Sequence, residues 1–217
     1  MVKFLHLFTI IFAGEIGLFL LFSSFYNPSL ASEFGGLTVV YNGLVYEPYF
    51  TVLFSIFFHN LMVATLDFIP FLGLLIMILS IISTGLVVAI GGSITGTPGL
   101  SIAFYLLTLP HSWLELPSYA VASASGIYFV IDASNNGLRN ATIRLLYMYL
   151  MVAIELFVAA AFEAGEIVDK PYGQLEYLFW IPAIPAFYFL IEFYKYFQRL
   201  ADSNKKYDRY YGGYPKY

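Results

Sequence analysis

The chain has no cysteine and very little charge. The lack of cysteine excludes disulfides, thiolate metal sites, haem attachment through thiols and cysteine nucleophiles. Charged residues make up only 11% of the 217 residues, against roughly 25% in an average soluble domain, whereas 60% are hydrophobic. A domain of this length has too little interior to bury that much apolar surface. The composition therefore excludes an ordinary water-soluble protein and a disordered one, and it predicts a protein embedded in lipid.

The long apolar stretches predict six transmembrane helices and an all-α membrane protein. They are Phe4–Phe25, Tyr49–Gly92, Trp113–Ile131, Thr142–Phe162 and Leu175–Tyr196. About 20 helical residues cross a hydrocarbon core about 30 Å thick, so the second stretch is long enough for two crossings. Asp67-Phe68-Ile69-Pro70 supplies the break, because proline cannot continue a helical hydrogen-bond ladder and an aspartate prefers the membrane edge.

The positions of the basic residues predict the orientation, because Lys and Arg in short loops stay on the cytoplasmic side. Nine of the ten lie at Lys3, at Arg139 and Arg144, or in the C-terminal tail. Six spans put all three places on one side, with both termini cytoplasmic and with segments 26–48, 93–112 and 163–174 outside. We expect one transmembrane domain over 1–200 and a flexible Tyr-rich cytoplasmic tail over 201–217. The small net charge of −4 gives no case for nucleic-acid binding.

The N-terminal segment also has features of a signal peptide, because Lys3 precedes an apolar run and Ser29-Leu30-Ala31-Ser32 follows it. The run is longer than the 7–15 residues of a signal core, and Glu15 lies in its middle. We therefore favour a retained helix with one carboxylate that faces inward.

Ionisable and amide side chains within the spans are candidate functional residues, because they are costly in lipid and normally face a bundle interior. They are Glu15, His59, Asn60, His111, Glu115 and Glu155. Glu155 has no local partner in the fifth span, Thr142–Phe162, and needs a donor on another helix, or it remains protonated. Glu192 lies one turn from Lys195 and is expected to be a paired residue at the inner surface.

The segment Leu109-Pro110-His111-Ser112-Trp113-Leu114-Glu115-Leu116-Pro117 carries the most information. His111 and Glu115 are four residues apart, so a helix would place them on one face within reach of each other. Such a pair could coordinate a metal, relay a proton or orient a polar helix start at the outer surface. A zinc hydrolase would be expected to show His-Glu-x-x-His and a further ligand, and this chain does not. We therefore assign no catalytic residue, no metal ligand and no cofactor.

The following helix is rich in small residues. Ser118, Ala122 and Gly126 recur at four-residue intervals, the small-xxx-small pattern of closely packed membrane helices, so this helix is expected to be central or at a subunit interface. Before it, residues 91–99 are too irregular to be helical throughout, and 100–109 are too few to span. We predict a short irregular or re-entrant segment around 93–110.

These motifs resemble the stage II sporulation protein M family. The family pattern has Pro-His-Gly, then Glu, then an alanine-rich helix that ends near a glycine; Pro110 to Gly126 is similar. Upstream, Phe57-Phe58-His59-Asn60 resembles the family's Phe-x-x-Asn, Gly73 its following glycine, and Thr84-Gly85 its Asn-Gly. The resemblance covers about residues 50–131. Two positions differ, since Thr84 replaces the asparagine and Ser112 replaces the glycine after the histidine.

The resemblance implies a multi-pass protein of the cytoplasmic membrane with no recognised catalytic activity. The sporulation member acts as an anchor or scaffold beside cell-wall hydrolases. We expect a non-enzymatic membrane scaffold, a homodimer or larger homo-oligomer, in which Asn60, His111 and Glu115 join the central helices and the tail docks a protein partner. The absence of cysteine and the abundant Tyr, Ile and Leu are compatible with a thermophilic archaeon. The alternative is a transporter or channel whose ionisable residues line a polar path.

Overall fold

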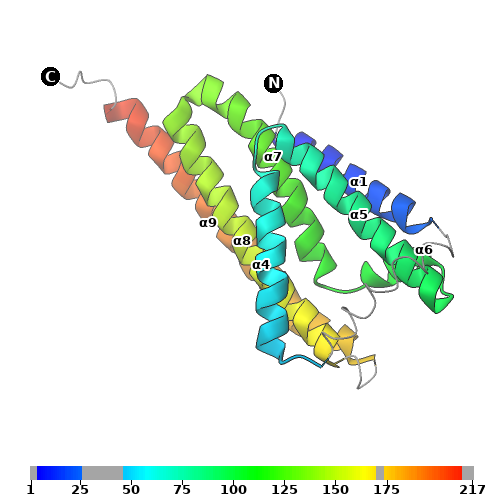
Figure 1. Cartoon of the computed structure of the whole chain (residues 1–217). Coiled ribbons are helices and arrows are strands. Elements are labelled where there is room, and N and C mark those ends of the chain that lie inside the picture. Colours follow the sequence, from blue (N-terminus) through cyan, green and yellow to red (C-terminus); the bar gives the residue numbers. More distant parts are fainter. Residues whose placement is uncertain (1–3, 26–45, 170–173, 212–217) are drawn as a thin grey trace.

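The structure is a computed structural model that describes residues 4–25, 46–169 and 174–211. Within these ranges it is helical, with no strand (Figure 1). The elements are α1 Phe4–Ser23, α4 Tyr49–Asp67, α5 Leu72–Thr95, α6 Gly99–Leu106, α7 Ser112–Asn136, α8 Leu138–Asp169, the 3-10 helix η2 Gln174–Phe179 and α9 Trp180–Tyr211. Most of the predicted outer segment 26–48 lies outside the described residues.

The prediction of six spans is confirmed, since six helical segments of the described chain are long and apolar enough to cross a membrane. The break inside the second stretch falls where proline predicted it, with α4 ending at Asp67 and α5 beginning at Leu72. Phe71 adopts a positive φ of 62° in the turn. The turn is so tight that a Cβ on Gly73 would overlap the backbone of Asp67. Only glycine fits this position without moving the backbone.

The predicted short irregular segment is also present. α5 ends at Thr95, and Gly96 caps it in the left-handed conformation with a φ of 70°. α6 then has only 8 residues, about 12 Å of helix, which is too short to cross a bilayer. A turn over 107–111 leads from α6 into α7. This turn positions the residues of the candidate site.

The fifth span is longer than the apolar stretch that predicted it. α8 has 32 residues and continues from Phe162 to Asp169. Glu163 and Glu166, which the charge pattern assigned to an outer segment, are therefore residues of the helix. At the other end only Gly137 separates α7 from α8, with a φ of 82°. Hydropathy alone does not predict these helix ends, because a helix can continue into polar sequence when its polar side chains are buried against partners in the bundle.

α7 is the central helix of the chain, with α8, α1, α4 and α5 packed around it. Its small residues are the reason: Ala120, Ala122 and Ala124 are fully buried and let the neighbouring backbones approach. Gly126 permits a close approach of α7 to the end of α4, since a Cβ built there would lie 2.6 Å from the Phe68 carbonyl oxygen. Of the two places expected for the small-residue helix, the structure shows the one inside the bundle.

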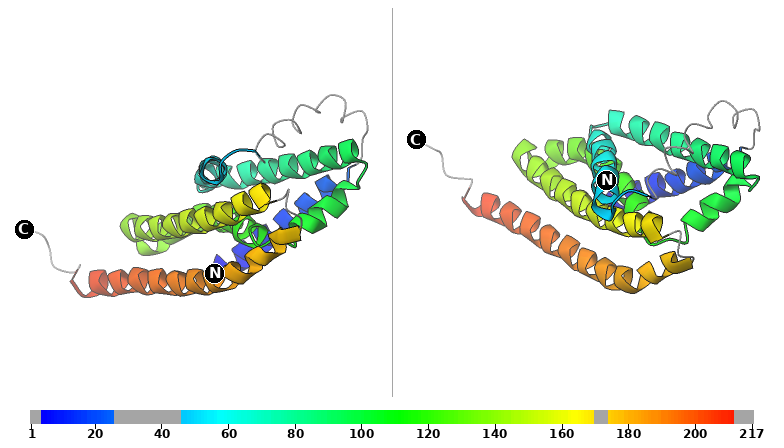
Figure 2. Two further views of the ribbon diagram at one scale, coloured as in Figure 1. Left: turned by 90° about the horizontal axis from the view of Figure 1, so that it is seen from below. Right: turned by 60° about the horizontal axis from the view of Figure 1, so that its bottom comes forward.

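α9 lies at the edge of the bundle, with α8 and η2 as its main neighbours. Figure 2 shows that its C-terminal part extends past the other helices. Of the tail predicted over 201–217, the part through Tyr211 continues the helix. Large apolar side chains are exposed over the outside of the bundle, for example Ile10 at 72% and Ile181 at 70%. Such a surface suits contact with lipid.

Candidate functional site

Polar side chains from α1, α4, α7 and α8 meet inside the bundle. Glu15 of α1 is 1% exposed, and Asp67 at the end of α4 is fully buried. His111 and Glu166 are buried as well. Carboxylates are strongly hydrated in water, so several of them in one interior need protons, hydrogen-bond donors or a cation in place of that water.

A cavity of about 80 Å³ joins several of these groups. Four of the six polar residues singled out in the sequence line it: Glu15, His59, Asn60 and Glu115. Asp67 and Tyr119 line it too. Asn60 is buried, whereas His59 is exposed and so lies at the outer edge of the cavity. Helices α1, α4, α5 and α7 all contribute lining residues, so the cavity is a feature of the assembled bundle.

The turn before α7 is held by hydrogen bonds to its backbone. The Ser112 hydroxyl donates to Leu106 O at 2.8 Å, and the Trp113 indole donates to Leu107 O at 2.8 Å. From α9, the Trp180 indole donates to Thr108 O at 2.9 Å. Tyr105 of α6 donates to Glu176 at 2.8 Å, and burial together with this bond raises the pKa of the phenol. His111 therefore stands on a well-supported turn.

His111 contacts α8 through Glu166. Its Nδ1 lies 2.5 Å from Glu166 Oε2, and this pair joins the turn before α7 to the last turns of α8. Burial alone would lower the pKa of His111, but the bond to Glu166 and the charges of Glu163 and Glu115 outweigh it and raise the pKa to about 9. The surroundings of His111 therefore favour a positive charge.

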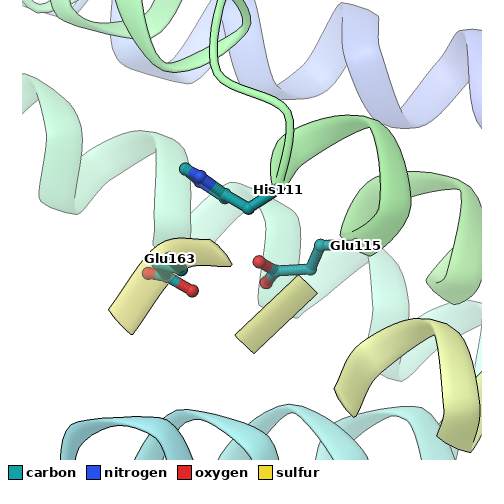
Figure 3. Close-up of side chains that lie close together, drawn as sticks. All are labelled: His111, Glu115 and Glu163. Atoms are coloured by element: carbon teal, nitrogen blue, oxygen red, sulfur yellow. The ribbon is translucent and has the colours of Figure 1, made fainter. Parts of the chain in front are cut away.

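Two further carboxylates converge on His111. One ligand atom each from His111, Glu115 and Glu163 lies within 4.8 Å of the other two. Figure 3 shows the carboxylates of Glu115 and Glu163 turned toward each other, with the His111 ring beside them. The Tyr119 hydroxyl donates to Glu115 Oε1 at 2.9 Å. Since Glu115 also lines the cavity, the cluster of His111, Glu115 and Glu163 lies directly beside it.

Several buried oxygens of the described residues have no hydrogen-bond partner. Near the site they are both carboxylate oxygens of Glu15, both of Asp67 and Oε1 of Glu166, and elsewhere they are Asp132 Oδ2 and the hydroxyls of Ser23, Ser123 and Ser125. A buried polar group without a partner costs free energy, about 1–3 kcal/mol and more when it is charged. Unpaired groups of this kind recur at functional sites, where a water, proton or ion completes them.

The other residues predicted from the sequence lie in separate environments. Glu155 of α8 finds the interhelical partner that it needs, since its Oε2 is 3.0 Å from the Ser118 hydroxyl of α7. Ala122 is buried among α4, α7 and α8, and Gly85 of α5 faces α1, where a Cβ would lie 2.8 Å from Phe22 Cβ. At the far end of α7, Arg144 Nη1 lies 2.7 Å from the buried Asp132.

Four residues of the site were not predicted: Asp67, Tyr119, Glu163 and Glu166. The sequence assigns Asp67 to the membrane edge because it lies at the break before Pro70. It assigns Glu163 and Glu166 to an outer segment because they follow the apolar stretch that ends at Phe162. The sequence signal that could have identified Glu163 and Glu166 was the spacing between them. Glu163 and Glu166 are three residues apart, which places both on one face if the helix continues. His111 and Glu115 have the analogous spacing on α7.

Six spans around an internal polar cluster define the chain as a multi-pass α-helical membrane protein. The profile of the Stage II sporulation protein M family matches residues 6–165, most of the chain and five of the six spans. The chain belongs to this family, as its motifs indicated. The comparison with curated proteins and the comparison with solved structures each found no match.

Proposed function

We propose that the protein is a non-enzymatic membrane subunit that helps to hold a complex together, with the end of α9 as its docking arm. Family membership supports a scaffold role. The observation that carries the proposal is the length of α9. The apolar stretch of the sequence ends at Tyr196, and the helix continues to Tyr211. Fifteen further residues at 1.5 Å each extend it by about 22 Å beyond the apolar span.

The sequence of this arm suits a protein partner near an anionic membrane surface. Arg199, Lys205, Lys206 and Arg209 follow the span. Basic residues just beyond a span are attracted to the cytoplasmic leaflet, which agrees with the predicted orientation. Tyrosines alternate with them, and tyrosine supplies a large contact area at a low cost in conformational entropy.

The test compares the full chain with two truncations, expressed in the natural host. One ends after Tyr196 and removes the arm, and the control ends after Tyr211 and keeps it. Native electrophoresis of membranes solubilised in mild detergent measures the mass of the assembly. We expect the full chain and the control to migrate in a complex larger than the purified protein, and the armless chain to migrate as the purified protein does. An unchanged complex without the arm would contradict the proposal.

A second candidate function, an ion or proton path, is favoured by the cavity. Glu15 and Asp67 line it with unpaired carboxylates, a type of environment found along ion pathways in membrane proteins. Proteoliposomes loaded with a pH-sensitive dye or with a cation-sensitive dye test this function. A path predicts flux that Glu15→Gln reduces and Glu155→Gln does not, because Glu155 does not line the cavity. Flux equal to that of empty liposomes would exclude it.

A further inference from the structure

We propose that His111, Glu115 and Glu163 form a binding site for a divalent transition-metal ion between the start of α7 and the end of α8. This inference goes beyond the docking role and does not depend on it. The three ligand atoms lie within 4.8 Å of one another. Ligands about 2.0–2.2 Å from one ion are at most about 4.4 Å apart, so small rotations of the side chains complete the site.

The two helices bring these donors together in a fixed geometry. His111 and Glu115 are one turn apart at the start of α7, which the hydrogen bonds of the preceding turn hold in place. Glu163 comes from α8, the helix most extensively packed against α7. The site therefore spans two neighbouring helices, and an ion bound there would join them.

Glu166 is a separate observation that points to a ligand. Its side chain is 5% exposed, its Oε2 contacts His111 Nδ1, and its Oε1 has no hydrogen-bond partner. Histidines that bind metals usually donate their second ring hydrogen to a carboxylate in this way, which orients the ring. Glu166 thus stands beside the three ligands as the expected positioning residue, with one oxygen still unpaired.

The second ring nitrogen of His111 is the one that can coordinate an ion. Ser112 Oγ lies 3.2 Å from Nε2, and the serine hydroxyl gives its single hydrogen to Leu106 O at 2.8 Å. Nε2 is therefore the donor to Ser112 Oγ in the ion-free protein. With Nδ1 hydrogen-bonded to Glu166, an ion would bind Nε2 and displace this hydrogen.

The charges around the site call for a cation. Glu115, Glu163 and Glu166 lie together in a largely buried region, and Glu115 continues into the cavity with Glu15 and Asp67. Two basic side chains pair with other carboxylates, Lys195 with Glu192 and Arg144 with Asp132. A divalent ion would neutralise two of the charges at once, which one protonated histidine cannot do.

The donor set indicates the class of ion. One imidazole and two carboxylates suit Zn²⁺ or Mn²⁺, whereas Mg²⁺ and Ca²⁺ prefer oxygen ligands throughout. No thiolate is available, so the site does not suit soft ions such as Cu⁺. The cavity beside Glu115 offers a polar route into the site.

The first experiment measures Zn²⁺ binding to the purified chain in detergent. The protein is stripped with a chelator, dialysed against buffered Zn²⁺ and analysed for bound metal. We expect one saturable ion per chain, an affinity at least 10-fold lower in Glu163→Gln, and an affinity 10–100-fold lower in Glu166→Gln. The matched control is Glu155→Gln, which removes a buried carboxylate of the same helix outside the cluster and should bind as the wild type does. No saturable binding, or equal binding by Glu163→Gln, would overturn the site.

A second measurement does not require the carboxylate variants to fold. In a chain with His6→Gln and His59→Gln, both at exposed positions, His111 is the remaining imidazole. Bound Mn²⁺ in this chain should show pulsed-EPR modulation from one imidazole nitrogen, and added Zn²⁺ should abolish the signal by displacing Mn²⁺. Mn²⁺ without nitrogen modulation would place the ion elsewhere and refute the proposal. Neither measurement involves the partner complex, so failure here leaves the docking role intact.

Discussion

The packing of α7 against the end of α4 predicts that Gly126→Ala destabilises the protein. A Cβ at residue 126 would lie 2.6 Å from the Phe68 carbonyl oxygen and 2.9 Å from the Phe68 carbonyl carbon. Both are backbone atoms, so no side-chain rotation can relieve the contact. Since ordinary contacts begin near 3.4 Å, the two backbones must separate by about 0.8 Å, the difference between 3.4 and 2.6 Å. The same separation would loosen the packing of Ala122, on α7, against Ala64 and Phe68.

The magnitude follows from two opposing effects. Alanine is favoured over glycine within a helix by about 1 kcal/mol. Overpacking in a close-packed interior costs about 1–3 kcal/mol and more where the backbone must move. We expect a net loss of about 1–2 kcal/mol for Gly126→Ala, which lowers the Tm of a chain of this size by about 2–8 °C.

Gly14→Ala is the matched control, because no atom lies within 4 Å of a Cβ at that position on α1. Gly14→Ala gains the higher helix propensity of alanine without a steric clash, so its Tm should equal or exceed that of the wild type. Thermal unfolding of the three chains in one detergent, followed by the static fluorescence of the tryptophans, measures the difference. Equal Tm values for Gly126→Ala and Gly14→Ala would refute the proposed close approach of α7 to α4.

Three further predictions follow from the structure and use the same unfolding assay. Arg144→Gln should cost about 3 kcal/mol, because it leaves the carboxylate of Asp132 buried without its cation, and the double variant with Asp132→Asn should recover most of the loss; equal Tm values for the single variant and the wild type would contradict the pair. Gly137→Ala should lower the free energy of unfolding by about 1–3 kcal/mol, because Gly137 has a φ of 82° between α7 and α8; an unchanged Tm would show that residue 137 does not have this backbone conformation. Glu15→Met should raise the Tm, because both oxygens of Glu15 are buried without partners; a lower Tm would show that a bound group pairs with them.

The span layout could be predicted because hydrophobic length and helix breakers act locally. Pro70 placed the turn between α4 and α5, and the glycines around 96–99 placed the end of α5 and the short α6. The four-residue spacing of His111 and Glu115 correctly brought their side chains within reach of each other. These properties depend on neighbours along the chain, which the sequence states directly.

The remainder of the site depends on contacts between distant segments. Glu163 and Glu166 follow an apolar stretch and have the sequence character of a loop, but His111, in the turn before α7, supplies the partner that pairs with Glu166 inside the bundle. Glu15 and Asp67 share a cavity only because α1 and α4 both pack against α7. Hydropathy cannot distinguish a carboxylate at a membrane edge from one in the interior, since that difference lies in the partner.

The site between α7 and α8 is tested most directly by the anomalous scattering of Zn²⁺ in crystals of the full chain. We predict one peak inside the bundle, about 2.0–2.2 Å from a nitrogen of His111 and from carboxylate oxygens of Glu115 and Glu163. A structure in which Glu163 faces lipid, or one whose anomalous peaks all lie outside this cluster, would contradict it.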